Sequence, residues 1–311
     1  FVIAKRGGYD APGALIPNPY FAGLYDGHDH DGLKSWGDTA AALKNAALEW
    51  PWAKRAPRAF WRGKIIAVNK AENCSLKDAG NRVRLRACAL SLDHADAVDV
   101  KCTDVAHCKP VAKFEANTPC EGSRTAAERR AAADPSLISG DGRVPLEDFA
   151  RWRYLLNLPG GSSGSYSRNL NHLWLMGSVV VLWDASFVEW LSPALEDGVT
   201  HVAANASSLA DVVRGLEKDP ARAAALVAAA GRVHEGFVAP SRLAAYFVEA
   251  LQRSRASVNA SALLDDACRL AHAVSETNCS SLNLVEVHLR EPAGIRRAPG
   301  CELLFEHARA L

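Results

Sequence analysis

The chain has 311 residues, of which 49% are hydrophobic, and its formal net charge at pH 7 is +1. This length and apolar content allow a large core and favour two domains over one. The near-zero charge argues against a nucleic-acid-binding protein, because such proteins usually carry a strong basic excess. The sequence shows neither a signal peptide nor an apolar run long enough to span a bilayer, so we expect the natural N-terminus upstream of Phe1.

The first half of the chain predicts alternating strands and helices. The predicted elements are a strand at Phe1–Ala4, a helix at Thr39–Glu49, a strand at Ala59–Val68, an alternating stretch at Asn81–Leu92 that continues into a helix, and a strand at Ala97–Lys101. Residues 103–145 are polar and contain proline and cysteine, as is typical of an interdomain connection.

Basic residues are concentrated in this half. Between Lys54 and Arg86 there are ten Lys or Arg residues but only two acidic ones. On an extended chain Arg82, Arg84 and Arg86 would share one face. Such a face suits a diphosphate, because guanidinium groups form paired hydrogen bonds with phosphate oxygens. A solvated basic strand edge explains the same pattern equally well.

The centre of the chain predicts a βαβ unit around a glycine- and serine-rich turn. Trp152–Leu158 predicts a strand, which residues 159–165 (Pro-Gly-Gly-Ser-Ser-Gly-Ser) interrupt. Tyr166–Met176 has helical spacing, Gly177 ends the helix, and Ser178–Leu182 predicts a buried parallel strand. A turn that leads into a helix N-terminus offers free N–H groups, so this unit predicts a phosphate site.

The remaining patterns extend the α/β arrangement. They predict a strand at Asp197–Ala204, a helix at Leu209–Lys218, a helix that begins at Asp219-Pro220, and a helix at Ser241–Arg255. We therefore expect an α/β protein with parallel sheets and two domains that face each other across a cleft. The expected units are residues 1–145, residues 146–256, and a cysteine-containing tail at 257–311 that packs on the body.

Cysteines and glycosylation motifs indicate an oxidising compartment. The eight cysteines contain no CxxC pair, which favours disulfides over a zinc ribbon. Asn-x-Ser sequons occur at Asn73, Asn205, Asn259 and Asn278. Both features predict a protein of the endoplasmic reticulum or Golgi lumen.

Two motifs leave other chemistry open. Residues 160–164 match G-x-S-x-G, the nucleophile elbow of α/β-hydrolases, with Ser162 as nucleophile and His201 or His234 as base. A phosphate cradle explains the same small residues. Residues 27–32 (Gly-His-Asp-His-Asp-Gly) contain a D-x-D triplet that in some glycosyltransferases holds a divalent ion, although a solvated loop is the simpler interpretation.

A series of segments, spread from about Leu43 to Gln252, resembles one enzyme family. These segments are Phe60-Trp-Arg-Gly, Asn81-Arg-Val-Arg-Leu, Arg151-Trp-Arg-Tyr-Leu, Ser165-Tyr-Ser-Arg-Asn, Gly177-Ser-Val-Val and Phe187-Val-Glu-Trp-Leu-Ser-Pro. In this order they resemble the family-90 glycosyltransferases, which include the Rumi-like protein O-glucosyltransferases and the fungal capsule-associated xylosyltransferases.

The resemblance implies a GT-B fold of two Rossmann-like domains and a UDP-sugar as donor substrate. It implies inverting transfer of glucose or xylose to a hydroxyl group of a protein serine or a glycan, with no metal and no other cofactor. Contact with a membrane is expected only through an N-terminal anchor upstream of Phe1. By position, the resemblance assigns donor binding to Arg62, Gly63, Lys64, Arg82, Ser165, Ser167, Arg168, Asn169 and Glu189.

The chain departs from the family pattern in two places. Lys64 and Ile65 stand where the animal enzymes have Ser-Arg, and Asn169 falls where an arginine is expected, with Arg168 one place earlier. The family's catalytic base is an aspartate that we expect upstream of Phe1, and Asp10 is the candidate within the chain. A hydrolase with Ser162 as nucleophile, or a noncatalytic relative that binds a nucleotide sugar or a glycan, is the alternative function.

Overall fold

The structure is a computed structural model. It describes residues 4–6, 15–17, 36–64, 76–103, 125–137, 144–160, 165–184 and 187–257. Asp10, the loop at residues 27–32, Ser162 and the predicted tail from residue 258 onward therefore lie outside the described residues.

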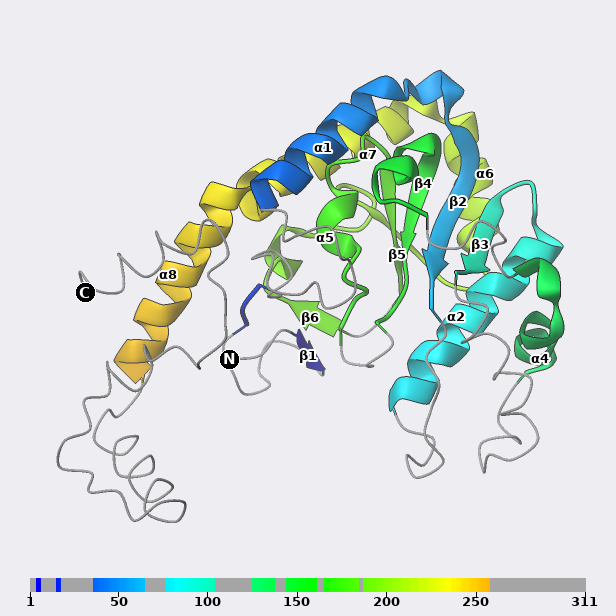
Figure 1. Ribbon diagram of the computed structural model, residues 1–311, viewed down its shortest axis with the longest axis horizontal. Coiled ribbons are helices and arrows are strands. Elements are labelled where there is room, and N and C mark those ends of the chain that lie inside the picture. Colours follow the sequence, from blue (N-terminus) through cyan, green and yellow to red (C-terminus); the bar gives the residue numbers. More distant parts are fainter. Residues whose placement is uncertain are drawn as a thin grey trace, which may run out of the picture.

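A parallel sheet of five strands forms the centre of the molecule, in the order β3–β2–β4–β5–β7 (Figure 1). Its strands are β2 (Ala56–Gly63), β3 (Val98–Cys102), β4 (Trp152–Asn157), β5 (Val179–Trp183) and β7 (Val202–Ala204). A separate antiparallel pair joins β1 (Ala4–Arg6) to β6 (Phe187–Glu189), with Ala4 opposite Glu189. Each predicted strand overlaps an observed one, although β7 covers only the last three residues of the predicted Asp197–Ala204. Residues 1–3 and 65–68 of the predicted strands lie outside the described residues.

Helices cover both faces of the sheet (Figure 1). They are α1 (Trp36–Glu49), α2 (Leu76–Asp93), α4 (Ala126–Ala133), α5 (Leu170–Leu173), α6 (Leu209–Lys218), α7 (Pro220–Val233) and α8 (Pro240–Ser257). Short 3-10 helices occupy Trp52–Lys54, Pro135–Leu137, Glu147–Arg151 and Ser192–Ala194, and a π-helical turn occupies His234–Val238. No helix in the described part of the chain is long and apolar enough to cross a membrane.

The side chains of β5 alternate between two hydrophobic cores. Val179 and Val181 pack in one core with residues of α2 and α6, whereas Val180 and Leu182 pack in the other with residues of α1, α5 and α8. All five residues of β5 are buried. Burial on both faces explains why this strand is a continuous apolar run and not an alternating one.

The pairing of β2 with β4 corrects the predicted domain boundary. Ala59 lies opposite Tyr154, and Phe60 lies opposite Leu155. Strands from both sides of the predicted division at residue 145 therefore belong to one sheet and not to two. The order of the five strands, counted along the chain, is 2-1-3-4-5, which is a doubly wound order with its switch point between β2 and β4.

The arginine-rich stretch is helical, which corrects its predicted extended geometry. It forms part of α2, where Arg82 and Arg86 are one turn apart and both pair with Glu128 of α4. Arg84 lies on another side of the helix and contacts the sheet. A short alternation of basic and apolar residues is compatible with a strand or with a helix. The packing of α2 against β3 and α4 favours the helix.

Two further expectations need correction. The helix predicted at Tyr166–Met176 is reduced to the four residues of α5, although Gly177 does adopt the expected positive φ of 62°. Cys88 is a buried free cysteine, so it takes no part in the predicted set of disulfides. Cys102 is disulfide-bonded.

Candidate functional site

The switch point brings together two of the predicted donor-binding segments. Gly63 and Lys64 lie at the carboxyl end of β2, and the glycine- and serine-rich turn follows the carboxyl end of β4. Doubly wound sheets bind their ligands outside the carboxyl ends of the strands at this position, because the connections on either side leave toward opposite faces. The candidate site is therefore the edge shared by β2 and β4.

Backbone hydrogen bonds close the base of the turn. The Gly160 N–H donates to the carbonyl of Ser165 at 2.8 Å, and the Ser167 N–H donates to the carbonyl of Leu158 at 2.9 Å. Pro159 and Tyr166 form an antiparallel bridge between these two bonds. The two ends of the turn therefore have fixed positions on the sheet.

Asn157 holds the far end of the turn, and the sequence analysis missed it. Its side chain is fully buried and bonds reciprocally with the backbone of Ser167. Nδ2 donates to the Ser167 carbonyl, and Oδ1 accepts from the Ser167 N–H, both at 3.1 Å. The available signal was a polar residue at the end of an apolar strand, where a buried amide needs partners.

Glu189, which is on β6, holds the neighbouring residue. Its Oε1 accepts a hydrogen bond of 2.8 Å from the Tyr166 N–H, and its side chain is buried. Burial raises the pKa of the Glu189 carboxyl to about 7, because the charged form loses its hydration. Glu189, which the resemblance assigns to donor binding, therefore holds the end of the turn in this structure.

Arg84, which is on α2, holds the start of the turn. Its Nε and Nη2 donate to the carbonyl of Pro159 at 3.2 and 3.1 Å, and its Nη1 donates to the carbonyl of Lys64. The side chain crosses from α2 to the sheet and is 5% exposed. One buried guanidinium therefore contacts the chain just beyond both β2 and β4.

Gly63 is required by the packing of Trp61. A Cβ atom at Gly63 would lie 2.3 Å from Cζ2 of the Trp61 ring, which no relaxed structure allows. The Arg84 guanidinium lies 5.4 Å from the centre of the same ring system. The tryptophan thus fills the space beneath the carboxyl end of β2.

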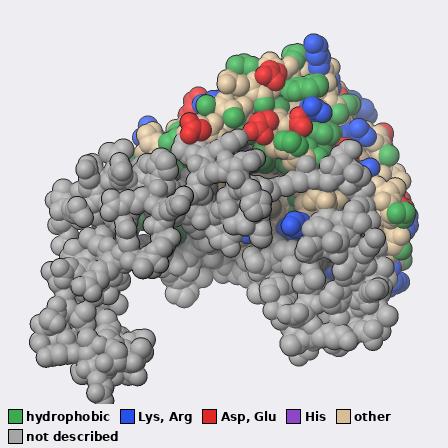
Figure 2. Space-filling view, viewed as in Figure 1, with side chains coloured by type: hydrophobic (Ala, Val, Ile, Leu, Met, Phe, Trp, Pro, Cys, Tyr) green, Lys and Arg blue, Asp and Glu red, His purple; other side chains and the backbone are tan. Residues whose placement is uncertain are grey.

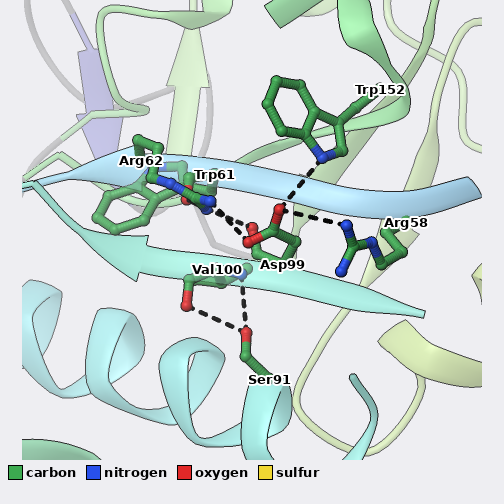
Figure 3. A network of polar contacts seen from close by, with 7 residues as sticks. All are labelled: Arg58, Trp61, Arg62, Ser91, Asp99, Val100 and Trp152. Carbon is green, nitrogen blue, oxygen red and sulfur yellow. Dashed lines mark hydrogen bonds and ion pairs between the residues drawn. The ribbon is translucent and has the colours of Figure 1, made fainter. Parts of the chain in front are cut away.

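The guanidinium of Arg62 faces Asp99 of β3 and makes no hydrogen bond to the described residues of the turn (Figure 3). Nη2 donates to Asp99 Oδ1 at 2.7 Å and Nη1 donates to the Asp99 carbonyl at 2.8 Å, and both side chains are 9% exposed. Trp152 Nε1 donates to the other carboxylate oxygen at 3.2 Å. With Arg58 and Lys101, this pair lines a pocket of about 290 Å³ at the β3 edge of the sheet.

The other predicted donor-binding residues lie around the turn, except Arg82, which pairs with Glu128. Ser165 and Ser167 close the base of the turn, and Arg168 and Asn169 precede α5. The N–H groups of Gly160, Tyr166 and Ser167 are bonded within the protein. A phosphate cradle formed by these three N–H groups is therefore not available in this structure.

The alternative sites receive little support. His201 directly precedes β7, whereas Pro159 and Gly160 follow the carboxyl end of β4, so His201 lies at the opposite end of the parallel sheet from the start of the turn. His234 is buried, and burial lowers its pKa to about 4. Among the described residues, no group of three or more His, Cys, Asp or Glu side chains is placed to hold a metal ion.

The surface shown in Figure 2 has no large patch of one charge in its described part. Acidic and basic side chains are interspersed over the upper part of this face, where Figure 1 places α1. This mixture agrees with the near-zero net charge of the chain.

The fold and the site define a doubly wound α/β protein with a candidate ligand site at its switch point. Comparison with family models matches residues 17–254 to glycosyl transferase family 90. Because this match spans more than half of the sequence, the chain belongs to the family-90 glycosyltransferases.

Other comparisons add less. Among solved structures, the sucrose-phosphate synthase of Thermosynechococcus elongatus matches with a TM-score of 0.41 and 11% identity. The match covers 70% of this chain and 49% of that one, so the chain spans about half the length of that structure. A search of curated proteins finds no match.

Proposed function

We propose that this chain carries the nucleotide-sugar domain of an inverting glycosyltransferase of GT-B type. The donor substrate is UDP-glucose or UDP-xylose, and the acceptor is a hydroxyl group of a protein serine or of a glycan. Transfer needs no metal and no other cofactor. The family membership supports the class of reaction, and the site supports the place of the donor.

One observation carries the placement of the donor. Gly63-Lys64 and residues 165–169, which the family resemblance assigns to donor binding, are about 100 residues apart in the sequence, yet they lie at or beyond the carboxyl ends of adjacent strands on either side of the switch point. In doubly wound sheets this is the position where nucleotides bind.

Transfer from a nucleotide sugar requires positive charge and hydrogen-bond donors near the diphosphate, at this edge of the sheet. When the glycosidic bond of a nucleotide sugar breaks, the departing diphosphate gains negative charge, and fixed donors stabilise that charge in the transition state. Lys64 lies beside the start of the turn, because its carbonyl and that of Pro159 accept hydrogen bonds from the same guanidinium, and Arg168 follows the turn by three residues. The acceptor hydroxyl needs a base, which we propose to be Asp10 or an aspartate upstream of Phe1.

Calorimetric titration of the chain with UDP tests the proposal. We expect saturable binding of UDP, with weaker binding of ADP and of GDP. Absence of measurable UDP binding under conditions where the chain is folded would overturn it. Hydrolysis or transfer assays with UDP-glucose and UDP-xylose then separate a transferase from a relative that binds the donor without reacting.

The hydrolase alternative is tested with Ser162→Ala. We expect this variant to leave any glycosyl transfer largely intact, because a serine in the turn is not a nucleophile in a glycosyl transfer. Loss of an ester hydrolase activity in this variant would favour the alternative function.

We further propose a location in the lumen of the endoplasmic reticulum or the Golgi. The four sequons support it.

A further inference from the structure

The pocket beside the Arg62–Asp99 pair lies apart from the candidate donor site. Its walls come from β2, β3, the end of α2 with the loop after it, and the 3-10 helix Pro135–Leu137. No described residue of β4 or of the glycine- and serine-rich turn lines it. β3 is the edge strand of the sheet, and β2 separates it from β4. A ligand in this pocket would therefore occupy a site of its own.

The side chains around the pocket carry an excess of positive charge. Its cations are Arg58 and Arg62 of β2 and Lys101 of β3, and Asp99 is the one carboxylate among the described residues that line it. Charges on partly buried walls are screened less than charges on an open surface. The excess of two positive charges therefore favours an anion in the pocket.

Asp99 already has a partner for each of its oxygens. Arg62 Nη2 lies 2.7 Å from Oδ1, and Trp152 Nε1 donates to Oδ2 at 3.2 Å. Arg58 approaches the same Oδ2 from the side opposite Arg62, at 4.0 Å (Figure 3). Lys101 has no acidic partner among the described residues. Asp99 thus compensates Arg62, and the charges of Arg58 and Lys101 remain.

Arg62 also has an unused hydrogen-bond donor. Its Nε is buried and makes no hydrogen bond with the described part of the chain, and the side chain is 9% exposed. Buried donors without a partner are rare and costly. A ligand oxygen that approaches this guanidinium is therefore favoured by a second feature, independent of the excess charge.

The size and walls of the pocket restrict the rest of the ligand. A volume of about 290 Å³ admits a small molecule. Leu92 and Leu137 add apolar wall beside the cations. A phosphate monoester carries about two negative charges at pH 7 and so matches two uncompensated cations, whereas a monocarboxylate matches one.

We propose that this pocket binds a small phosphate monoester, such as a sugar phosphate, through Arg58 and Lys101. The inference goes beyond the proposed function, because it concerns a second ligand at a second place on the sheet. It does not depend on the identity of the donor.

Calorimetry on the whole chain tests the proposal, with glucose 6-phosphate as probe and with glucose and inorganic phosphate as comparisons. We expect saturable binding of glucose 6-phosphate that weakens as salt is added, and no binding of glucose. Inorganic phosphate should bind about tenfold more weakly, because it makes no contact with the apolar wall. Absence of saturable binding of glucose 6-phosphate, or equal affinity for inorganic phosphate, would overturn the proposal.

Three variants locate the binding. Arg58→Gln and Lys101→Gln each remove one uncompensated charge and should weaken binding by about tenfold, as for a lost charge-assisted contact. Ala95→Trp, at an exposed position that lines the pocket, keeps the charge and should weaken binding at least as much by filling the space.

Lys218→Gln, at an exposed position of α6, is the matched control and should leave the affinity within about twofold. Thermal unfolding checks that each variant is folded, and any folded variant of the three suffices for the comparison. Parent-like affinity in the folded variants would overturn the proposal.

UDP distinguishes this site from the donor site. We expect Lys101→Gln to keep its affinity for UDP within about twofold, and glucose 6-phosphate to bind in the presence of saturating UDP. Displacement of glucose 6-phosphate by UDP would show that the two ligands share one site and would overturn the inference. If the parent protein binds no UDP, the proposed function fails, whereas the titrations with glucose 6-phosphate still decide this inference.

Discussion

The guanidinium of Arg55 donates a hydrogen bond of 2.7 Å to the carbonyl of Gly177, 122 residues further along the chain. The same group donates to the carbonyls of Ala47, Trp50 and Met176 and to the hydroxyl of Ser178. Arg55 precedes β2, and Gly177 precedes β5. One buried cation therefore joins the end of α1 to the amino ends of two strands, opposite the candidate site.

Arg55→Met should destabilise the protein strongly. The change leaves several buried carbonyls without a donor, and we expect a loss of about 3 kcal/mol in the free energy of unfolding. Urea denaturation measures this loss. Arg222→Met, at an exposed position of α7, is the control and should shift the free energy by less than about 0.5 kcal/mol. Equal effects of the two changes would contradict the role given to Arg55.

Arg62 and Asp99 should behave as a coupled pair. Each side chain is 9% exposed, so removal of one partner leaves the other charge buried. We expect Arg62→Met and Asp99→Asn each to cost about 3 kcal/mol of unfolding free energy, and the double variant to cost clearly less than their sum. A double-mutant cycle by urea denaturation checks this, and additive losses would show that the two groups do not interact.

Glu189 should make stability depend on pH. Its folded pKa of about 7 lies above the ordinary value of 4.5, so its contribution is fully present below pH 4.5 and is lost as the pH rises through 7. We expect the stability of the parent protein relative to Glu189→Gln to fall by about 2–3 kcal/mol between pH 5 and pH 8.

The difference between the two proteins isolates Glu189 from other titrations. His234, whose pKa is lowered to about 4, acts in the opposite sense, because its contribution is present above pH 6.5 and is lost as the pH falls toward 4. Both proteins contain His234, so this effect cancels. If the difference in stability between the two proteins did not change with pH, the pKa of the Glu189 carboxyl would not be raised in the folded protein.

Two glycine substitutions should have opposite signs. In Gly63→Ala the new methyl group meets the Trp61 ring at 2.3 Å, so the ring or the strand must move, and we expect a loss of about 1–3 kcal/mol. In Gly215→Ala, within α6, the methyl group meets nothing within 4 Å, and we expect a gain of about 0.5–1 kcal/mol. Thermal unfolding compares them, and stabilisation by both changes would contradict the close packing at Gly63.

Asn205 should carry a glycan when the chain is made in a secretory host. It is exposed, and its Oδ1 accepts hydrogen bonds from the N–H and hydroxyl of Ser207, the third residue of the sequon. Mass spectrometry of the peptide, with and without glycosidase treatment, detects the modification, and Asn205→Gln removes it. A peptide that is wholly unmodified in such a host would contradict the proposed lumenal location.

Local features of the sequence predicted much of the fold. The helix Leu209–Lys218 has the predicted bounds, and Asp219 caps α7 by accepting a hydrogen bond from the Arg222 N–H. Gly177 has the positive φ expected at the end of a helical segment. Each of these features depends on neighbouring residues only, so composition and spacing suffice to predict it.

Features that depend on contacts between distant residues were missed. The alternation in Asn81–Leu92 did not reveal that Ser91 accepts a hydrogen bond from the Val100 N–H and donates one to the Val100 carbonyl, which fixes α2 beside the edge strand β3. The sequence patterns also did not reveal that β2 pairs with β4 across the predicted domain boundary.

The sequence by itself determined the family and the strands on either side of the glycine- and serine-rich turn. The tertiary structure alone decided that Arg84, and not Arg62 or Arg82, contacts the edge between β2 and β4. The physical reason is that strand order and helix rotation depend on how two apolar cores are filled. These choices determine which of several similar arginines is buried beside a carbonyl and which pairs with a carboxylate.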